Sequence, residues 1–199
     1  MNNDSSFGSA LVLAGGIGSR IGYDKKNLEI AGEKLIDRTI NTLSGVFDEI
    51  IVSSNNEFVR PNILTLKDKI GAGPLAGIYQ GLTHCKSDYL FVIACDMPFL
   101  SVGYIRFLQE KLKNRICDAA VTRREDGFLE PFNSFYNKSC TVPIMEALRN
   151  ESFKILPLLK KLNLEIIPPE EFKQFEKGNL FFNINYKEDL EKAGSLIFQ

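Results

Sequence analysis

The feature that most constrains this chain is an apolar segment that runs directly into a glycine-rich loop, residues 10–25, ALVLAGGIGSRIGYDK. The apolar residues 11–13 are typical of a buried strand in a parallel sheet, because such strands are covered on both faces. The glycines that follow lack a Cβ atom, so backbone N–H groups can approach a ligand closely. Arg20 and Lys25 add two positive charges to the same loop. Converging N–H groups flanked by cations indicate a polyphosphate site.

Two familiar phosphate-binding loops do not fit this segment. A Walker A loop needs Lys and then Ser or Thr after its last glycine, whereas Gly22 is followed by Tyr23 and Asp24. A dinucleotide-binding fingerprint needs a third glycine where Ile21 stands. A glycine-rich turn between a strand and a helix, with no ligand, is the alternative left open by the loop alone.

Composition argues against several other classes of protein. The 199 residues carry a net charge of −1, so no general basic surface favours nucleic acid and a phosphate site must be local. Apolar runs such as 89–95 are too short to span a bilayer, and the first residues lack the basic start and apolar core of a signal peptide. The four cysteines form no C-x-x-C pair, which favours buried free thiols in a reducing cytoplasm. His84, the one histidine, has no evident partner for a catalytic triad.

Strand and helix patterns alternate along the rest of the chain. Short apolar runs predict strands at residues 28–30, 49–53, 63–66, 89–94, 119–122, 130–136 and 164–167, and a last extended piece at 181–185. Helical spacing of apolar residues predicts helices at 35–47, 74–82, 102–113, 140–149, 153–162 and 187–197. The alternation within 130–136 suggests an exposed or edge strand. These patterns predict one α/β domain over residues 1–199, with 1–8 flexible and a three-layer, mostly parallel central sheet carrying helices on both faces.

Polar residues follow two of these strands, at the edge where ligands gather in open α/β sheets. Ser53 ends the strand at 49–53, and Asp96 follows the strongest strand, 89–94. A carboxylate in that position suits Mg²⁺, which prefers oxygen ligands. A helix cap or turn is the alternative for a lone Asp, but the neighbouring polyphosphate loop favours the metal role. The several glycines of segment 71–82 fit close packing and ligand contact equally well.

The segments LAGGIGSRIGYDK, GPLAGIYQGL, ACDMPFL, EPF and FNINYKEDL closely resemble the nucleotidyltransferases with a glycosyltransferase A-like fold. Within them the chain is most similar to the molybdenum cofactor guanylyltransferases, over about residues 10–190. The resemblance implies a nucleotide-diphospho-sugar transferase-like fold. It also implies Mg²⁺-dependent transfer of GMP from GTP to the phosphate of molybdopterin or molybdenum cofactor, with release of pyrophosphate.

The resemblance implies roles for individual residues as well. Arg20, Lys25 and Asp96 would be catalytic: the two cations neutralise the triphosphate, and Asp96 binds the metal. Asn183 and Asn185 would lie at the acceptor end, with Asn185 as a second candidate metal ligand. Contacts to the nucleotide are implied for Leu13, Ala14, Gly15, Lys25, Ser53, Asp68 and Asp96.

Some positions depart from the family pattern. Residues 32–35 read GEKL where G-K-P-L is usual, Ser53 stands where a relative has asparagine, and the tail at 185–189 reads NYKED. These differences leave the prediction of nucleotidyl transfer unchanged. They leave two alternatives to a guanylyltransferase, namely a cytidylyltransferase for the same cofactor and a sugar-phosphate nucleotidyltransferase. A non-catalytic nucleotide-binding module would be expected to lack Asp96 or Lys25, and both are present.

The expected partners are GTP, molybdopterin or molybdenum cofactor, and biosynthetic proteins that deliver the cofactor, with neither nucleic acid nor membrane. Arg123 and Arg124, at a strand end, either meet the acceptor phosphate or lie on a solvated turn. Phe132 and Phe182 either line a pterin pocket or belong to the core.

Overall fold

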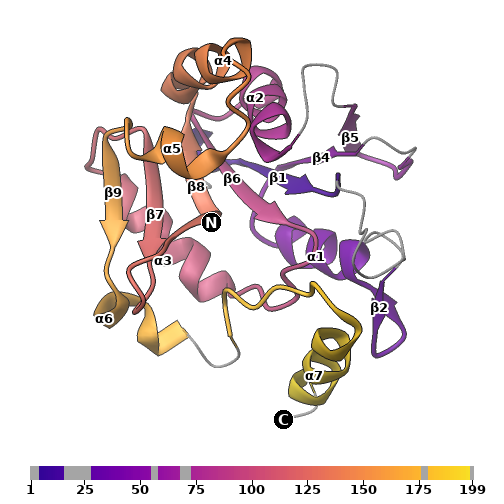
Figure 1. Cartoon of the computed structure of the whole chain (residues 1–199). Helices are drawn as coiled ribbons and strands as arrows, with labels where there is room; N and C mark the ends of the chain where they lie inside the picture. Colours follow the sequence, from indigo (N-terminus) through magenta and orange to yellow (C-terminus); the bar gives the residue numbers. More distant parts are fainter. Residues whose placement is uncertain (1–4, 16–27, 55–57, 68–72, 176–178, 198–199) are drawn as a thin grey trace.

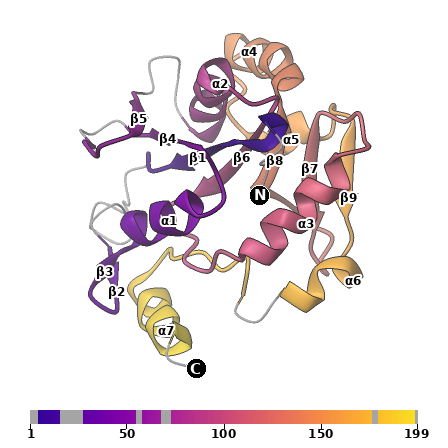
Figure 2. The same ribbon diagram turned by 180° about the vertical axis from the view of Figure 1, so that it is seen from behind.

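The computed structural model describes residues 5–15, 28–54, 58–67, 73–175 and 179–197 (Figure 1). Strands and helices alternate along most of the chain, and helices pack on both faces of one central sheet (Figures 1 and 2). The three-layer α/β arrangement predicted from the sequence is therefore confirmed. Within the described ranges, no helix combines the length and the apolar character needed to cross a membrane.

The central sheet has seven strands in the order β5-β4-β1-β6-β8-β7-β9. β1, β4, β5 and β6 are parallel, β7 and β9 are parallel, and β8 runs antiparallel to its neighbours β6 and β7. A separate hairpin is formed by β2 and β3. The strand bounds are Ser9–Leu13 (β1), Glu29–Ile30 (β2), Glu33–Lys34 (β3), Glu49–Ser53 (β4), Ile63–Leu66 (β5), Tyr89–Ala94 (β6), Ala119–Arg123 (β7), Leu129–Asn137 (β8) and Leu164–Ile167 (β9).

The helices largely follow the predicted segments. Their bounds are Leu35–Ser44 (α1), Pro74–His84 (α2), Val102–Leu112 (α3), Thr141–Arg149 (α4), Ile155–Leu159 (α5), Pro169–Phe172 (α6) and Lys187–Ile197 (α7). The helices expected at 35–47 and 153–162 are shorter than predicted, whereas the one at 187–197 is confirmed. The extended piece expected at 181–185 does not join the sheet.

Strand β8 lies inside the sheet, so the prediction of an exposed or edge position was wrong. It pairs with β6 on one side and β7 on the other, and Phe135 has no exposed surface. Its polar residues are buried as well: Ser134 Oγ donates to the Glu130 carbonyl at 3.1 Å, and Asn133 Nδ2 donates to the Leu180 carbonyl at 3.3 Å. The alternation of polar and apolar residues wrongly predicted exposure to solvent, because these polar side chains donate hydrogen bonds to main-chain carbonyls rather than to water.

Two hydrophobic cores lie on opposite faces of the sheet. Ala10 and Val12 of β1 share one core with residues of α1 and α3, whereas Leu11 and Leu13 share the other with residues of α2, α4 and α5. Figures 1 and 2 show these two groups of helices on opposite faces of the sheet. Burial on both faces explains why β1 is apolar at every position that follows Ser9. All four cysteines are free and buried, as predicted.

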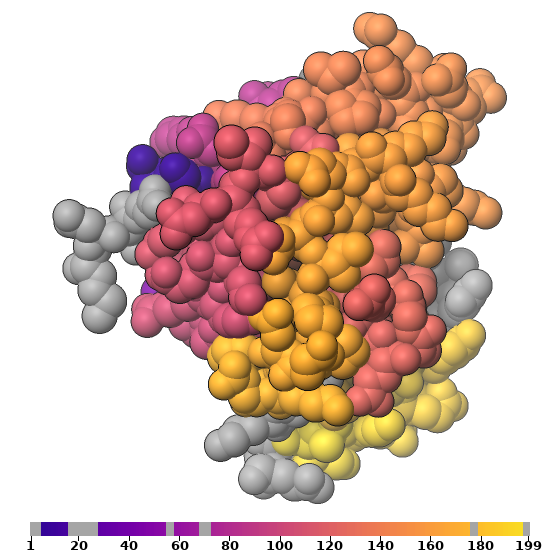
Figure 3. Space-filling model, turned by 90° about the vertical axis from the view of Figure 1, so that its left-hand side faces the viewer, coloured from indigo at the N-terminus to yellow at the C-terminus, as the bar shows by residue number. Residues whose placement is uncertain are grey.

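The described residues near each end of the chain are also packed against the body of the protein. Phe7, at the end of the N-terminal segment predicted to be flexible, is buried and stacks on Tyr89 with ring centroids 5.3 Å apart. At the other end, Ile184 and Ala193 join a third apolar cluster with Leu35 and hairpin residues. Viewed from the β9 edge, β9 and α6 run along the surface of the molecule beside α3 (Figure 3).

Helix α2 approaches the sheet closely because glycines face it. A Cβ atom on Gly77 would lie 2.6 Å from Leu13 Cδ2 and 2.8 Å from Ser53 Oγ. A Cβ atom on Gly81 would lie 2.8 Å from Leu90 Cδ2. Carbon atoms in contact are normally about 3.5–4.0 Å apart, so both positions leave no room for a side chain. At these two glycines the structure favours close packing over ligand contact.

Gly77→Ala is expected to lower the free energy of unfolding by up to about 2 kcal/mol. Overpacking a core costs about 1–3 kcal/mol, and the better helix propensity of alanine offsets roughly 1 kcal/mol of this. Urea unfolding measures the difference. Gly194→Ala in α7 is the matched control, because a Cβ atom there meets nothing within 4 Å; it should be neutral or stabilising. Equal stabilisation by both substitutions would contradict the packing argument.

Candidate functional site

Main-chain hydrogen bonds continue beyond the strands at the carboxyl edge of the sheet. They link the end of β4 to the residue after β1, the end of β1 to the residue after β6, and Asp96 to a loop near the C-terminus. The three bonds run from Ala14 N to Ser53 O at 2.8 Å, from Cys95 N to Leu13 O at 3.0 Å, and from Ile184 N to Asp96 O at 2.9 Å. Segments far apart in the sequence are thereby held side by side at one edge, where open α/β sheets bind ligands.

The predicted nucleotide-binding residues of β1 lie at this edge. Leu13 ends the strand, Leu13 and Ala14 are buried, and Gly15 is exposed. At the end of this strand, therefore, only the main-chain groups and the exposed glycine are well placed to contact a ligand. Arg20, Lys25 and Asp68 lie outside the described residues, so their roles stay predictions.

Ser53 is packed rather than open. Its side chain is almost completely buried, and its Oγ lies under Gly77 of α2. Its carbonyl accepts the bond from Ala14 N. The structure brings Ser53 to the predicted edge, and the predicted nucleotide contact from this residue stays a prediction.

Asp96 lies just beyond the end of β6 and is 9% exposed. Its main chain holds the segment that carries the two predicted acceptor residues, Asn183 and Asn185, through the bond to Ile184. The candidate metal ligands in this region are thus carboxylate and amide oxygens, which suit a hard cation such as Mg²⁺.

The number of donors also fits Mg²⁺. Among the residues that the structure describes, no group of three or more His, Cys, Asp or Glu side chains could hold a metal ion. Mg²⁺ is commonly held by one or two carboxylates together with water and substrate phosphates, not by a closed protein cage. Asp96 therefore fits a metal that is bound jointly with a nucleotide.

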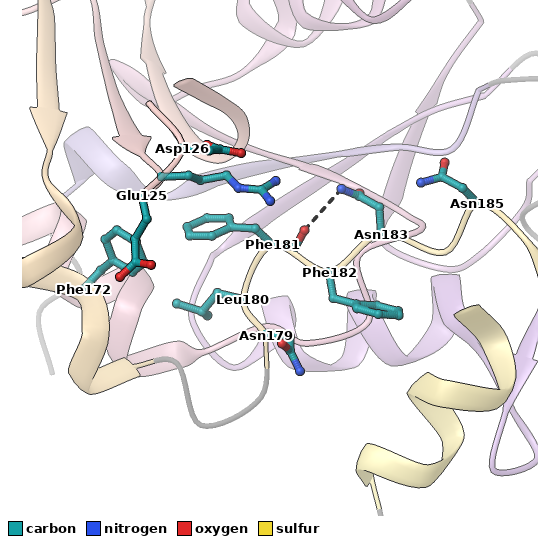
Figure 4. A pocket seen from close by; sticks show the side chains of 10 residues that line it. Glu125, Asp126, Phe172, Asn179, Leu180, Phe181, Phe182, Asn183 and Asn185 are labelled. Carbon is teal, nitrogen blue, oxygen red and sulfur yellow. Dashed lines mark hydrogen bonds between the residues drawn. The ribbon is translucent and has the colours of Figure 1, made fainter. Parts of the chain in front are cut away.

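A pocket of about 600 Å³ lies beside this segment (Figure 4). It combines aromatic and aliphatic side chains with amide and charged groups. Its lining consists of Arg124, Glu125, Asp126, Phe172, Asn179, Leu180, Phe181, Phe182, Asn183 and Asn185. The pocket unites both predicted acceptor residues with Arg124, one of the two arginines considered for the acceptor phosphate.

The two asparagines differ in how they are held. Asn183 Nδ2 donates to the Phe181 carbonyl at 3.3 Å, whereas the Asn185 side chain stands farther along the same loop, away from the other labelled side chains (Figure 4). The backbone of Asn185 is fixed, because its N–H and that of Tyr186 both donate to Asp189 Oδ2 at 2.9 Å. Asn183 thus stabilises the pocket wall, and Asn185 presents an exposed amide at its rim.

Glu130 is a functional candidate to which the sequence analysis assigned no role. The residue is 3% exposed, and its Oε2 lies 3.7 Å from Arg124 Nη1. The pKa of its carboxyl is raised from 4.5 to about 7: burial is the main cause and the charge of Asp96 adds to it, while the Phe132 N–H and Arg124 act in the opposite direction. The available signal was a charged residue within an otherwise apolar strand pattern, just before Pro131.

This pKa predicts a pH-dependent stability that Glu130→Gln should remove. The folded protein binds the proton more tightly than the unfolded chain does, so the stabilisation is complete below pH 4.5 and is lost as the pH rises through 7. The difference between the pKa of 4.5 and the pKa of about 7 corresponds to about 3 kcal/mol of unfolding free energy. Urea unfolding between pH 4.5 and 8 in EDTA should show a smaller decline for Glu130→Gln than for the unmodified protein.

Glu125→Gln is the matched control, because this neighbouring carboxylate is largely exposed. Its stability should follow that of the unmodified protein at every pH. Parallel curves for Glu130→Gln and the unmodified protein would show that Glu130 titrates normally.

Comparison with known proteins agrees with this geometry. A family model described as the MobA-like NTP transferase domain matches residues 10–164. The chain is 38% identical to a probable molybdenum cofactor guanylyltransferase of Peptoclostridium acidaminophilum, over 94% of this chain and 88% of the relative. It is 36% identical to the molybdenum cofactor guanylyltransferase of Syntrophotalea carbinolica, over 94% of this chain and 90% of the relative.

Solved structures give the same picture. Molybdopterin-guanine dinucleotide biosynthesis protein A from Archaeoglobus fulgidus superposes with a TM-score of 0.83 at 30% identity, covering 96% of this chain and 98% of that one. A 2-C-methyl-D-erythritol 4-phosphate cytidylyltransferase from Thermus thermophilus, at 18% identity and a TM-score of 0.72 over 96% and 98% of the two chains, shares the fold alone. The resemblance seen in the sequence is confirmed: the chain belongs to the family of MobA-like NTP transferase domains.

Proposed function

We propose that this protein transfers GMP from GTP to the phosphate of molybdopterin or molybdenum cofactor, forming the guanine dinucleotide and releasing pyrophosphate. The names of relatives at 38% and 36% identity support guanine as the base and molybdenum cofactor as the acceptor. One structural observation carries the proposal. Asp96, at the end of β6, is bonded through its main chain to the segment that lines the 600 Å³ pocket. A nucleotide site and an acceptor site would then meet at Asp96.

The reaction needs no protein nucleophile, because the attacking oxygen belongs to a phosphate that is already anionic. A bond forms between this oxygen and the α-phosphorus of GTP. The bond from the α-phosphorus to the bridging oxygen breaks, and pyrophosphate leaves with the electron pair. The protein must therefore hold two anions in line and reduce their repulsion.

The residues divide between these tasks. In the proposal, the end of β1 with Arg20 and Lys25 binds the triphosphate, and Asp96 holds Mg²⁺, with Asn185 as a second candidate ligand. The bound metal supplies positive charge at the phosphates. Asn183 and Asn185 form the acceptor side. All of this lies within one nucleotidyltransferase domain, for which we propose a cytoplasmic location.

Pyrophosphate release tests the reaction. Purified protein with Mg²⁺ and molybdopterin-type cofactor is expected to release pyrophosphate with GTP and not with CTP, ATP or UTP. EDTA should abolish the release. Release with CTP instead of GTP would contradict guanine as the base of the substrate and favour the cytidylyltransferase alternative. No release with any nucleotide, while GTP still binds, would overturn the transfer reaction with this acceptor.

The same assay tests Asp96. Asp96→Asn should lower turnover by about 10²–10³, which is the usual loss when one transition-state charge contact is removed. Asp88→Asn is the matched control, since Asp88 directly precedes β6 at the opposite edge of the sheet and is exposed. Turnover of Asp88→Asn should equal that of the unmodified protein. Equal turnover of the two variants would refute the role of Asp96.

A further inference from the structure

An irregularity in β8 determines where the carboxylate of Glu130 lies. Ala120 of β7 pairs with Phe135 and Thr122 pairs with Glu130, so residues 131–134 of β8 lie opposite Val121 alone. Within this bulge Asn133 has a φ of 54°, in the left-handed region. Bulges of this kind occur next to active sites, where they redirect a side chain.

The bulge is held by the strand's own side chains. Tyr136 Oη donates to the Pro131 carbonyl at 2.6 Å, and Ser134 Oγ donates to the Glu130 carbonyl at 3.1 Å. Tyr136 and Ser134 are both fully buried. The irregular backbone is therefore built into the core of the protein, and it fixes the position of Glu130.

Glu130 in turn positions Arg124. The Glu130 side chain is only 4% exposed, whereas that of Arg124 is 42% exposed and lines the pocket. The Arg124 Cζ atom also lies over the ring of Phe128, 5.9 Å from the ring centroid. A guanidinium group has five N–H donors in a planar fork, so donors stay available to a ligand in the pocket.

The surrounding charges make this cation the natural anchor for an anion. Arg124 is the one cation among the described residues that line the pocket. Glu125 and Asp126 also line it, and Asp96 lies near Glu130. An anionic ligand that enters this acidic surrounding needs a fixed positive charge to offset the repulsion.

We propose that Arg124, held in place by Glu130, binds the phosphate monoester of the acceptor in this pocket. The inference rests on the proposed function and adds a specificity-determining residue to it. The contact is charge-assisted and favours phosphate because the planar fork matches two phosphate oxygens. Phe181 and Phe182 give the apolar surface for the rest of the acceptor. In the transfer step, a third oxygen of this phosphate forms the bond to the α-phosphorus of GTP, and pyrophosphate leaves.

Direct binding tests the inference without requiring turnover. The probe is a fluorescent pterin, titrated with and without its phosphate monoester. The unmodified protein should bind the phosphorylated form roughly 10- to 100-fold more tightly, the range expected for hydrogen bonds to a charged group. Arg124→Gln should lose most of this preference, and Arg124→Lys should keep part of it.

Arg123→Gln is the matched control, because Arg123 is exposed at the end of β7 and does not line the pocket. It should keep the full preference. Equal preference in Arg124→Gln and Arg123→Gln would overturn the inference, and so would failure of the unmodified protein to bind either pterin. GTP affinity and the unfolding midpoint should be the same in all variants. If Arg124→Gln lowered both the GTP affinity and the unfolding midpoint, the substitution would have a general structural effect, and the inference would be overturned.

Turnover separates this inference from the proposed function. Arg124→Gln should raise the KM for the acceptor and leave the KM for GTP within about twofold. If the unmodified protein transfers no GMP but prefers the phosphorylated pterin through Arg124, the proposed function fails and the binding assignment stands. If transfer occurs and the acceptor KM is unchanged in Arg124→Gln, the assignment fails and the proposed function stands.

Discussion

The hydrogen bond from Ile184 N to Asp96 O, at 2.9 Å, is the interaction on which the arrangement of the site depends. It ties the loop before α7 to the end of β6, two segments that are almost ninety residues apart in the sequence. The third apolar cluster, which contains Ile184 and Ala193, supports the same contact from outside the sheet. Together with the bond from Asn133 Nδ2 to the Leu180 carbonyl, it fixes the pocket lined by Asn183 and Asn185 relative to the carboxyl edge of the sheet.

Electrostatics give this edge its chemical character. Asp96 and Glu130 are both largely buried, the charge of Asp96 acts on the Glu130 carboxyl, and Arg124 pairs with Glu130. Such a region binds a divalent cation well and repels phosphates until positive charge is supplied. A reaction between two phosphates suits it only when a metal and the loop cations offset that repulsion, which is the arrangement that we propose.

Sequence patterns predicted the parallel half of the sheet well, because β1, β4 and β6 are buried on both faces and read as continuous apolar runs. They also placed Asp96 at the end of β6. They failed for β8, whose buried polar side chains bond to carbonyls that no local pattern reveals. For the same reason Glu130 was missed as a site residue: its burial follows from a bulge and from tertiary packing, neither of which is encoded in hydrophobic periodicity.

A crystal structure with Mn²⁺ and a non-hydrolysable GTP analogue tests the central claim most directly, since anomalous scattering locates the metal. The account predicts the metal on the Asp96 carboxylate, the triphosphate at the end of β1, and the pocket beside Asn183 still open for the acceptor. A metal bound away from Asp96, or a nucleotide seated in the pocket between Arg124 and Asn183, would contradict it.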